Sequence, residues 1–323
     1  MKLPVIAITI GDPAGIGPEI VLKAVARFEV RARCRPLVIG SRAILDQVAH
    51  QLGLVSATDV DDIPLSPDAI VPGRESPAAG RSAVLAVKRA VALVQSGAAD
   101  AIATAPLNKA AMVSAGFHYP GHTELLAELA GVQDYTMMLA AGKLRVVHTS
   151  THVSLSEAIR RVTRQRVFTV IRIAHGTLGR MGIPRPRIAV AGLNPHAGEG
   201  GLFGREEIDH IAPAIAEARA AGFDASGPWP GDTIFFRCAR GDFDVVVAQY
   251  HDQGHVAVKQ AGFETGVNIT AGLPFFRVSV DHGTAFDLAW QGKASERSMV
   301  EAILLAADLA RTTSSPGTFI APA

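Results

Sequence analysis

Three histidines in separate parts of the chain carry the side chains that a divalent metal ion needs. His152, His196 and His251 each follow a short apolar run. Neutral imidazoles bind Zn²⁺ and other borderline divalent metals, and three protein ligands leave positions for a substrate oxygen. In an open α/β sheet the loops after the carboxyl ends of the strands gather at one edge, so three such histidines could converge. Taken singly, each is better explained as a loop residue that satisfies a backbone group.

Two turns could present backbone N–H groups to an anion. Gly11–Glu19 follows the first apolar run and leads into a helix with Pro18 at its first position. It lacks the third glycine of a dinucleotide fingerprint and the Lys-Ser/Thr pair of a P-loop, so a tight strand-to-helix turn explains it equally. Gly121–Glu124 precedes an apolar helix, where Thr123 is predicted to cap the helix and His122 to lie beside an anion site.

Other polar segments suit a phosphorylated ligand and a nucleotide. Lys259, Asn268 and Arg277 could clamp a phosphate or a carboxylate, although a basic residue taken singly is usually solvated surface. The loop Gly198–Gly204 allows a ligand to approach the backbone, as does a merely flexible loop. Asp281–Ala285 is predicted to open another helix, with donors for a nucleotide or simply a helix cap. The sequence has no Gly-x-Ser-x-Gly elbow and no cysteine in a nucleophile motif, which disfavours covalent hydrolysis.

The elements that must position these groups alternate along the chain. Short apolar runs that predict buried strands alternate with stretches in which apolar residues recur at helical spacing, and this alternation predicts an α/β fold. The predicted strands are Val5–Ile10, Pro36–Gly40, Ala101–Thr104, Tyr135–Leu139, Leu144–His148, Arg187–Ala191, Val245–Gln249 and Val267–Thr270. The predicted helices are Pro18–Phe28, Arg81–Gln95, Leu125–Leu129, Arg164–Met181, Glu206–Ala221 and Met299–Ala310. A Pro/Ser/Asp-rich loop is predicted over Asp59–Gly80, and a loose tail after Arg311.

Composition bounds the class of protein. The chain has 323 residues, 48% of them hydrophobic, which is enough for about two domains. Its net charge of +1 gives no field that would attract nucleic acid or an anionic membrane. Cys34 and Cys238 form no disulfide framework, the first apolar run is a strand and not a signal peptide, and no run reaches the about 20 residues of a membrane span. A cytoplasmic location is expected.

Taken together, several ordered segments resemble the 4-hydroxythreonine-4-phosphate dehydrogenase family of pyridoxal phosphate biosynthesis. Gly15–Glu19 and the segment from His282 to Lys293 are also similar to isocitrate and isopropylmalate dehydrogenases, which bind the nucleotide without a Rossmann fingerprint. The segments that carry the family resemblance are Gly11–Glu19, Thr104–Lys109, Gly121–Glu124, Gly192–Gly201, Tyr250–Gly254, Gly266–Thr270 and Ser279–Ala285.

The resemblance implies a homodimer of two-domain α/β subunits of the isocitrate/isopropylmalate dehydrogenase-like type, with the active site in the interdomain cleft at the dimer interface. One α/β domain would comprise 1–128 plus 283–323. The other, 129–282, would carry the metal and the dimer interface.

The resemblance also implies roles for individual residues. His152, His196 and His251 match the family's metal ligands, with His251 supplied by the second subunit. Lys259 is expected to donate or relay a proton. The residues that match substrate contacts are His122, Thr123, Lys259, Asn268 and Arg277, and those expected to face the cofactor are Gly198, Gly200, Gly201, His282, Gly283, Thr284 and Ala285.

The activity that the resemblance implies is an NAD-dependent, divalent-metal-dependent oxidation, with NADP as the alternative cofactor and Zn, Mn, Co or Mg as the metal. Its substrate would be 4-phosphohydroxy-L-threonine, giving a β-keto acid that decarboxylates to 3-amino-2-oxopropyl phosphate. The segments Tyr119–His122, Thr149–His152 and His251–His255 are similar to a sister branch that oxidises 4-phosphothreonate or 4-phosphoerythronate. Intact Gly121–Glu124 and Gly266–Thr270 argue against the relative that oxidises aromatic cis-dihydrodiol carboxylates. A metal-dependent hydrolase and a non-catalytic metabolite-binding protein are the alternatives from other classes.

Overall fold

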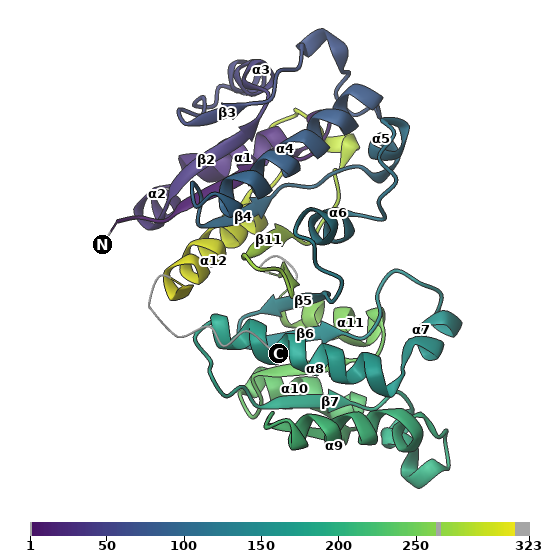
Figure 1. Cartoon of the computed structure of the whole chain (residues 1–323). Coiled ribbons are helices and arrows are strands. Elements are labelled where there is room, and N and C mark those ends of the chain that lie inside the picture. The colour runs from purple at the N-terminus through teal and green to yellow at the C-terminus, as the bar shows by residue number, and fades with distance from the viewer. Residues whose placement is uncertain (1, 263–265, 314–323) are drawn as a thin grey trace. The chain divides into compact units, whose positions relative to one another are not determined.

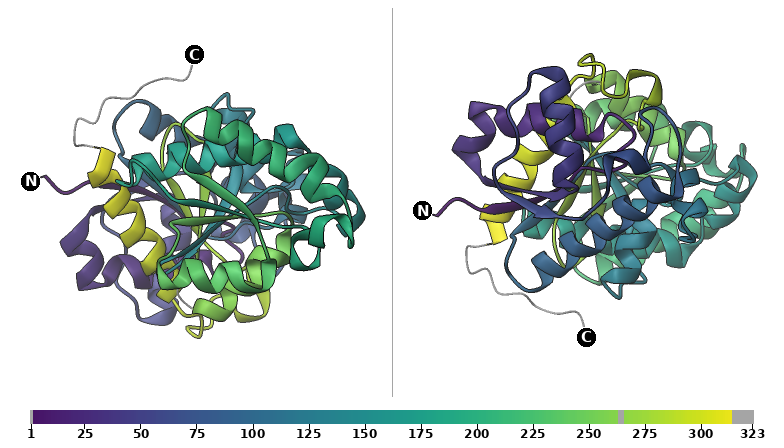
Figure 2. Two further views of the ribbon diagram at one scale, coloured as in Figure 1. Left: turned by 90° about the horizontal axis from the view of Figure 1, so that it is seen from below. Right: turned by 90° about the horizontal axis from the view of Figure 1, so that it is seen from above.

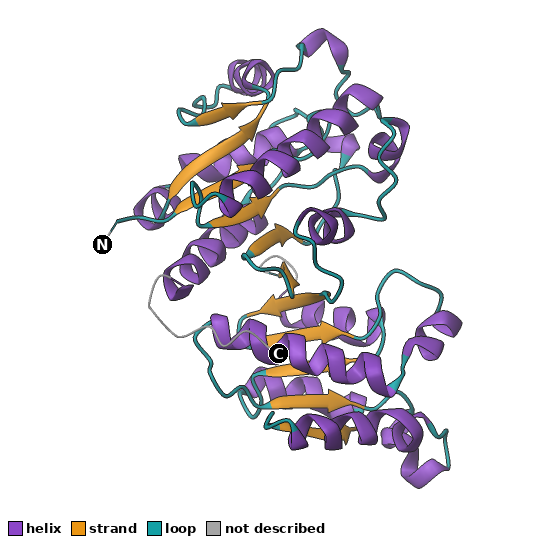
Figure 3. Cartoon of the chain, in the orientation of Figure 1, coloured by secondary structure: helices purple, strands orange, loops and turns teal. Residues whose placement is uncertain are grey.

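The chain folds into two compact α/β units, each built on its own part of a sheet (Figures 1 and 3). The computed structural model describes residues 2–262 and 266–313. Unit 1 comprises Met1–Gly131 and Pro274–Ala323, and unit 2 comprises Val132–Leu273. The sequence-based boundaries after 128 and 282 differ from these, because strand β11 (Arg277–Val280) pairs with β4 (Ala101–Thr104) of unit 1.

Unit 1 contains a parallel sheet in the strand order β3-β2-β1-β4-β11. The long helix α4 (Pro77–Gln95) packs on one face of the sheet, and α12 (Arg297–Thr313) packs on the other beside α1 (Gly17–Ala26). Both views of Figure 2 show α12, in yellow, beside the purple N-terminal helices. The remaining elements of unit 1 are β1 (Val5–Thr9), α2 (Phe28–Arg33), β2 (Arg35–Gly40), α3 (Arg42–Leu52), β3 (Val60–Asp62), a 3₁₀ turn (Pro67–Ala69), α5 (Lys109–Ser114), α6 (His122–Leu129) and a 3₁₀ turn (Phe286–Leu288).

Unit 2 contains a mixed sheet in the order β10-β5-β6-β9-β7-β8, in which β6, β9, β7 and β8 are parallel and β5 is antiparallel to both of its neighbours. Its core gathers aliphatic side chains of β6, β7 and β9 with Phe235 and Val258. The elements are β5 (Thr136–Ala141), β6 (Leu144–His148), α7 (Leu155–Arg161), α8 (Arg164–Arg180), β7 (Ile188–Ala191), a turn (Pro195–Gly201), a π-helical turn (Glu207–Ile211), α9 (Ala212–Ala220), β8 (Ala225–Trp229), α10 (Gly231–Arg240), β9 (Val245–Ala248), α11 (His251–Gly262) and β10 (Val267–Ala271).

All eight predicted strands and all six predicted helices are present, so the α/β fold class is confirmed. The sequence missed three strands, β3, β8 and β11, and six helices: α2, α3, α5, α7, α10 and α11. β3 has only three residues, and β8 contains Gly227 and Pro228, which a strand tolerates best at the edge of a sheet. The loop predicted over Asp59–Gly80 therefore contains β3 and the start of α4. The predicted tail from 314 onward lies outside the described residues.

Helix ends follow local rules where the sequence offers a cap. The Ser41 hydroxyl accepts a hydrogen bond from Ile44 N at the start of α3, and Gly53 ends that helix in the left-handed conformation. Among the described residues, no helix has both the length and the apolar character that a membrane crossing requires.

Candidate functional site

The three candidate metal ligands of unit 2 follow three adjacent parallel strands. His152 comes four residues after the end of β6, His251 is the first residue of α11 after β9, and His196 lies in the loop after β7. The strand order is β6-β9-β7, with β9 pairing in parallel with both neighbours. The predicted placement of each histidine after a strand is confirmed, and because parallel strands end at the same edge, the three loops share that edge.

The ring geometry brings two of the three histidines together. The ring centroids of His152 and His251 are 5.5 Å apart, and the His251 ring stacks on that of His255 at 3.5 Å. Asp252 Oδ1 lies 2.7 Å from His251 Nδ1, an arrangement in which a carboxylate orients an imidazole and leaves Nε2 to bind a metal. The donor chemistry therefore fits a borderline divalent ion, although the described residues of a single chain contain no group of three His, Cys, Asp or Glu side chains that could hold one.

The loop that carries His196 has an uncommon backbone. Its residues from His196 to Gly200 all have positive φ, between 45° and 81°, and Gly201 follows with φ 102°. Gly198 is buried against a carboxylate, whereas a Cβ at Gly200 would meet nothing within 4 Å. Of the three glycines expected to face a cofactor, Gly200 has open space beside it.

Lys259 and Asn268 also belong to unit 2. His251, His255 and Lys259 are spaced four residues apart on α11, so they lie on one face of that helix. Asn268 lies on β10, and its buried Oδ1 has no hydrogen-bond partner within residues 2–262 and 266–313. An unsatisfied buried acceptor of this kind is rare and suits a ligand that donates a hydrogen bond.

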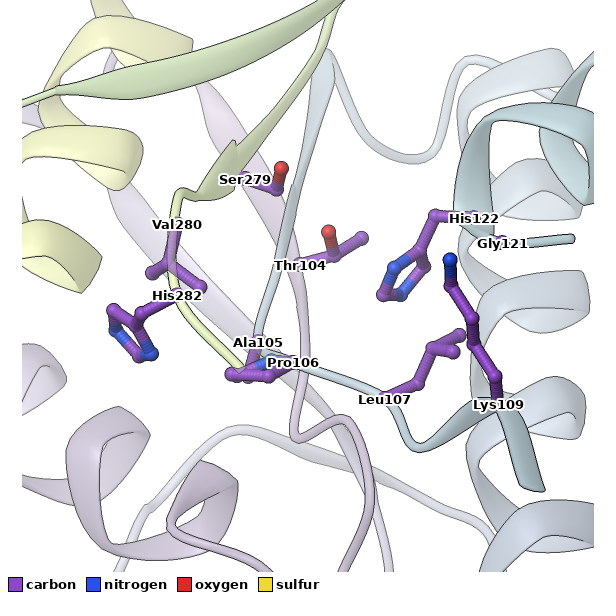
Figure 4. A pocket seen from close by; sticks show the side chains of 10 residues that line it. All are labelled: Thr104, Ala105, Pro106, Leu107, Lys109, Gly121, His122, Ser279, Val280 and His282. Atoms are coloured by element: carbon purple, nitrogen blue, oxygen red, sulfur yellow. The ribbon is translucent and has the colours of Figure 1, made fainter. Parts of the chain in front are cut away.

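A pocket with about 380 Å³ of empty space, open solvent included, lies within unit 1 (Figure 4). Its walls come from the carboxyl ends of the parallel strands β4 and β11 and from the start of α6. Figure 4 shows the hydroxyls of Thr104 and Ser279, the imidazoles of His122 and His282, and the Lys109 side chain around it. The sequence anticipated His122 and His282. Thr104, Lys109 and Ser279 were named only as part of the ordered segments Thr104–Lys109 and Ser279–Ala285, and not as individual site residues.

A buried charge behind the pocket favours an anion, because Arg277 lies against the lining residue Thr104. Arg277 is 2% exposed, and its Nε and Nη2 donate to Thr104 Oγ1 at 3.1 and 2.6 Å. Burial lowers the pKa of Arg277 to about 9, opposed by the charge of Glu124, so the guanidinium is protonated at pH 7. Burial, and then the charge of Arg277, hold the pKa of His122 well below its usual range, which keeps that imidazole neutral.

His122 supplies an unsatisfied polar atom to the same pocket. Its Nε2 is buried and has no hydrogen-bond partner in the described part of the chain. A neutral imidazole nitrogen can donate or accept, depending on the tautomer, so a ligand oxygen could satisfy it in either form. The prediction that Thr123 caps α6 is wrong: the helix begins at His122 with Gly121 at the N-cap position and no side-chain cap.

The two turns that resemble nucleotide-binding segments contact each other within unit 1. Ile16 N donates to Thr284 O at 3.0 Å, and a Cβ on Gly15 would come within 2.9 Å of that oxygen. The prediction that Asp281–Ala285 opens a helix is wrong, because only the 3₁₀ turn Phe286–Leu288 follows, without a side-chain cap. Gly283 is exposed, and a Cβ added to it would meet nothing within 4 Å, which leaves this loop accessible to a nucleotide.

Glu19, the last residue of the first turn, has a structural role that the sequence did not reveal. Its fully buried carboxylate accepts from Lys23 Nζ at 2.7 Å and from the N–H groups of Gly292 and Ala294 at 3.1 and 2.9 Å. Glu19 therefore anchors the segment after the 282–285 loop.

Asp12, in the same turn, is buried with Oδ1 accepting from Ala14 N at 2.8 Å and Oδ2 without a partner among the described residues. Burial raises its pKa from 3.8 to about 6. Between about pH 4 and 6 the folded state retains a proton that the unfolded state has lost, so this group lowers stability as pH rises through that window.

Asp12→Asn is expected to raise the free energy of unfolding by up to about 3 kcal/mol at pH 7.5. Urea denaturation at pH 7.5 and pH 4 measures this, and an equal difference at both pH values would contradict it.

Comparison with known proteins finds similarity along almost the whole chain. The family model described as pyridoxal phosphate biosynthetic protein PdxA matches residues 32–306. The D-threonate 4-phosphate dehydrogenase of Cupriavidus necator is 50% identical, over 95% of this chain and 98% of the relative. The crystal structure of a 4-hydroxythreonine-4-phosphate dehydrogenase from Klebsiella pneumoniae is 49% identical, with a TM-score of 0.88 over 95% of this chain and 99% of that one.

A more distant likeness concerns the fold alone. A β-decarboxylating dehydrogenase from Thermococcus kodakarensis is 14% identical, with a TM-score of 0.50, over 95% of this chain and 82% of that one. On the evidence of the family model and of the two similar dehydrogenases, the chain belongs to the PdxA family of pyridoxal phosphate biosynthetic proteins.

Proposed function

We propose that the chain is a dehydrogenase that depends on NAD and a divalent metal and oxidises the secondary hydroxyl of a small acid phosphorylated on carbon 4. The observation that carries the proposal is the unit 1 pocket. In it, His122 Nε2 has no hydrogen-bond partner among the described residues, and the Thr104 hydroxyl is held by buried Arg277, so both groups could bind an anionic ligand. The dehydrogenase names of two relatives about 50% identical support the reaction class. A metallohydrolase would leave the 282–285 loop without a nucleotide to bind.

The preferred substrate in this proposal is 4-phosphothreonate, because a relative that is 50% identical is named for threonate 4-phosphate. The second candidate, 4-phosphohydroxythreonine, is favoured by the name of the similar solved structure. The two acids differ at carbon 2, which carries a hydroxyl in the first and an amino group in the second. Oxidation at carbon 3 gives a β-keto acid in both cases, and such acids lose carbon dioxide readily.

The proposed roles divide between binding and chemistry. Arg277, through its charge, and His122, through Nε2, would bind anionic and polar oxygens of the substrate, with Asn268 contributing its free acceptor. NAD, bound along Gly283, would accept the hydride, and a metal held by His152, His196 and His251 would lower the pKa of the reacting hydroxyl. His251 would come from a second copy of the chain, so the proposal includes a homodimer. The His152 and His251 rings of one chain, 5.5 Å apart, would then serve two neighbouring metal sites, one completed by each copy.

Lys259 is proposed to relay a proton at the reacting carbon. Two helical turns separate it from His251 on the same face of α11, which directs both side chains to one side of the helix. An ammonium group can donate the proton that a decarboxylated product needs. Loss of substrate binding without loss of turnover in Lys259→Ala would contradict this role.

The test follows NADH formation with 4-phosphothreonate, 4-phosphohydroxythreonine and 4-phosphoerythronate, each with a chelator and then with Zn²⁺, Mn²⁺, Co²⁺ or Mg²⁺ restored. We expect the highest kcat/KM with 4-phosphothreonate, loss of turnover with chelator and recovery with metal. Turnover that the chelator leaves unchanged would refute the metal, and no NADH with any of the three acids would refute the dehydrogenase.

A further inference from the structure

The loop that carries His196 adopts a conformation that its own residues disfavour. We define the His196 loop as Asn194–Gly201. His196, Ala197 and Glu199 have φ of 52°, 54° and 45°, in the left-handed region where a Cβ collides with the backbone. A run of this kind persists only when surrounding groups hold it, and backbone held in this way recurs at functional sites.

The group that holds the loop is the carboxylate of Glu207. Glu207 is 3% exposed and starts the π-helical turn Glu207–Ile211, a type of turn that is frequent at functional sites. Its Oε1 accepts from the backbone N–H groups of Leu193 and Asn194, both at 2.7 Å, and its Oε2 accepts from Asn194 Nδ2 at 2.9 Å. All three partners are donors, so only a side chain with two acceptor oxygens satisfies them together.

The left-handed run packs directly against this carboxylate. A Cβ on Gly198 would lie 2.8 Å from Glu207 Oε2, and one on Gly192 would lie 2.8 Å from Ala197 Cα and 3.2 Å from Glu207 Oε1. Both glycines are therefore needed for the loop to close around Glu207, which fixes the backbone on either side of His196.

We propose that Glu207 is a positioning residue for His196: its carboxylate holds the left-handed loop and, through it, keeps the imidazole in place to bind a divalent metal ion. This inference rests on the metal dependence of the proposed function. Glu207 would touch neither metal nor substrate.

The test measures binding of Co²⁺ to the full-length protein by its visible absorption, together with thermal unfolding. In Glu207→Gln the amide group must face a donor, either Asn194 Nδ2 or the two backbone N–H groups, so the loop loses part of its support. We expect the Kd for Co²⁺ to rise about 10- to 100-fold. The matched control is Glu206→Gln. The Glu206 carboxylate accepts from the Asn194 side chain at 2.7 Å and from the backbone of Arg205 and Glu206, whereas Glu207 accepts from Leu193 N and Asn194 N. The Kd of this control should stay within about threefold of wild type.

The outcomes separate the two proposals. If the wild-type protein does not bind Co²⁺, the metal dependence of the proposed function falls, and this inference falls with it. If the wild-type protein binds Co²⁺ and Glu207→Gln binds it equally well, only the positioning role is refuted. Should Glu207→Gln fail to fold, Asn194→Ala keeps the backbone bonds to Glu207 and removes the side-chain one. A higher Kd in that variant supports the role, and an unchanged Kd overturns it.

Discussion

An equal mixture of His251→Ala and His152→Ala chains is expected to regain about a quarter of wild-type turnover after subunit exchange, although each variant alone is inactive. In a shared site, the His251→Ala chain supplies His152 and His196, and the His152→Ala chain supplies His251. One of the two sites in each mixed dimer is then complete, and random exchange makes half of the dimers mixed. This expectation follows from the proposed function, in which two copies of the chain build each metal site.

Each single variant should lose about 10³-fold or more in kcat, because the metal supplies several kcal/mol of stabilisation to the developing charge. The measurement is NADH formation after the two chains, carrying different affinity tags, are produced separately, mixed and allowed to exchange subunits. The His50→Ala variant, which changes an exposed histidine on α3, is the matched control and should keep full turnover. Mixed dimers without activity, from subunits that purification through both tags shows to be folded and paired, would show that a single chain supplies all three ligands.

Arg277→Met is expected to weaken binding of the phosphorylated substrate about 100-fold or more without lowering the stability of the protein. The guanidinium is 2% exposed, and burial depresses its pKa to about 9, so the folded chain holds this charge at a cost in free energy. The sign follows from linkage: at pH 7 the group is charged in both the folded and the unfolded state, and that cost lessens only as pH rises above about 9. Replacing a buried charge by an apolar side chain of similar volume is often neutral or stabilising.

The readouts are the KM for substrate and the free energy of unfolding at pH 7.5. Arg277→Lys keeps the charge but loses the two-pronged contact with Thr104, so its KM should lie between those of wild type and Arg277→Met. Arg89→Met, at an exposed arginine paired with Asp61, is the control and should change neither readout appreciably. A large drop in stability with an unchanged KM would mean that Arg277 serves only the fold.

The Co²⁺ measurement on Glu207→Gln tests whether the backbone of the His196 loop contributes to the metal site that the mixed-dimer experiment examines. A weaker metal site in that variant would explain why five consecutive residues with positive φ are retained beside His196. The substrate assay and the Asp12→Asn denaturation then address unit 1, where the chemistry is anion binding and burial of charge.

Much of the architecture was determined by local sequence. The apolar runs before His152, His196 and His251 are short and rich in β-branched residues, so β6, β7 and β9 were predicted within a residue or two. The amphipathic spacing of α4, α8 and α12 identified these helices for the same reason, since burial of one face is encoded within the segment itself. The ordered segments that resemble the PdxA family gave the candidate ligands.

Local patterns did not determine which strands and loops lie next to one another. β9 lies between β6 and β7 in the sheet although it comes after both in the chain, and that order brings the loops of His251 and His152 together. The pocket takes its walls from segments near 104, 122 and 280, and Glu207 reaches back 14 residues to Leu193. These placements depend on strand order and on buried carboxylates and guanidinium groups whose partners are distant in sequence. The sequence by itself therefore determined the strands and the types of side chain at their ends. Only the tertiary structure decided which of these side chains meet, because the packing energy between distant segments does not depend on the residue spacing within either segment.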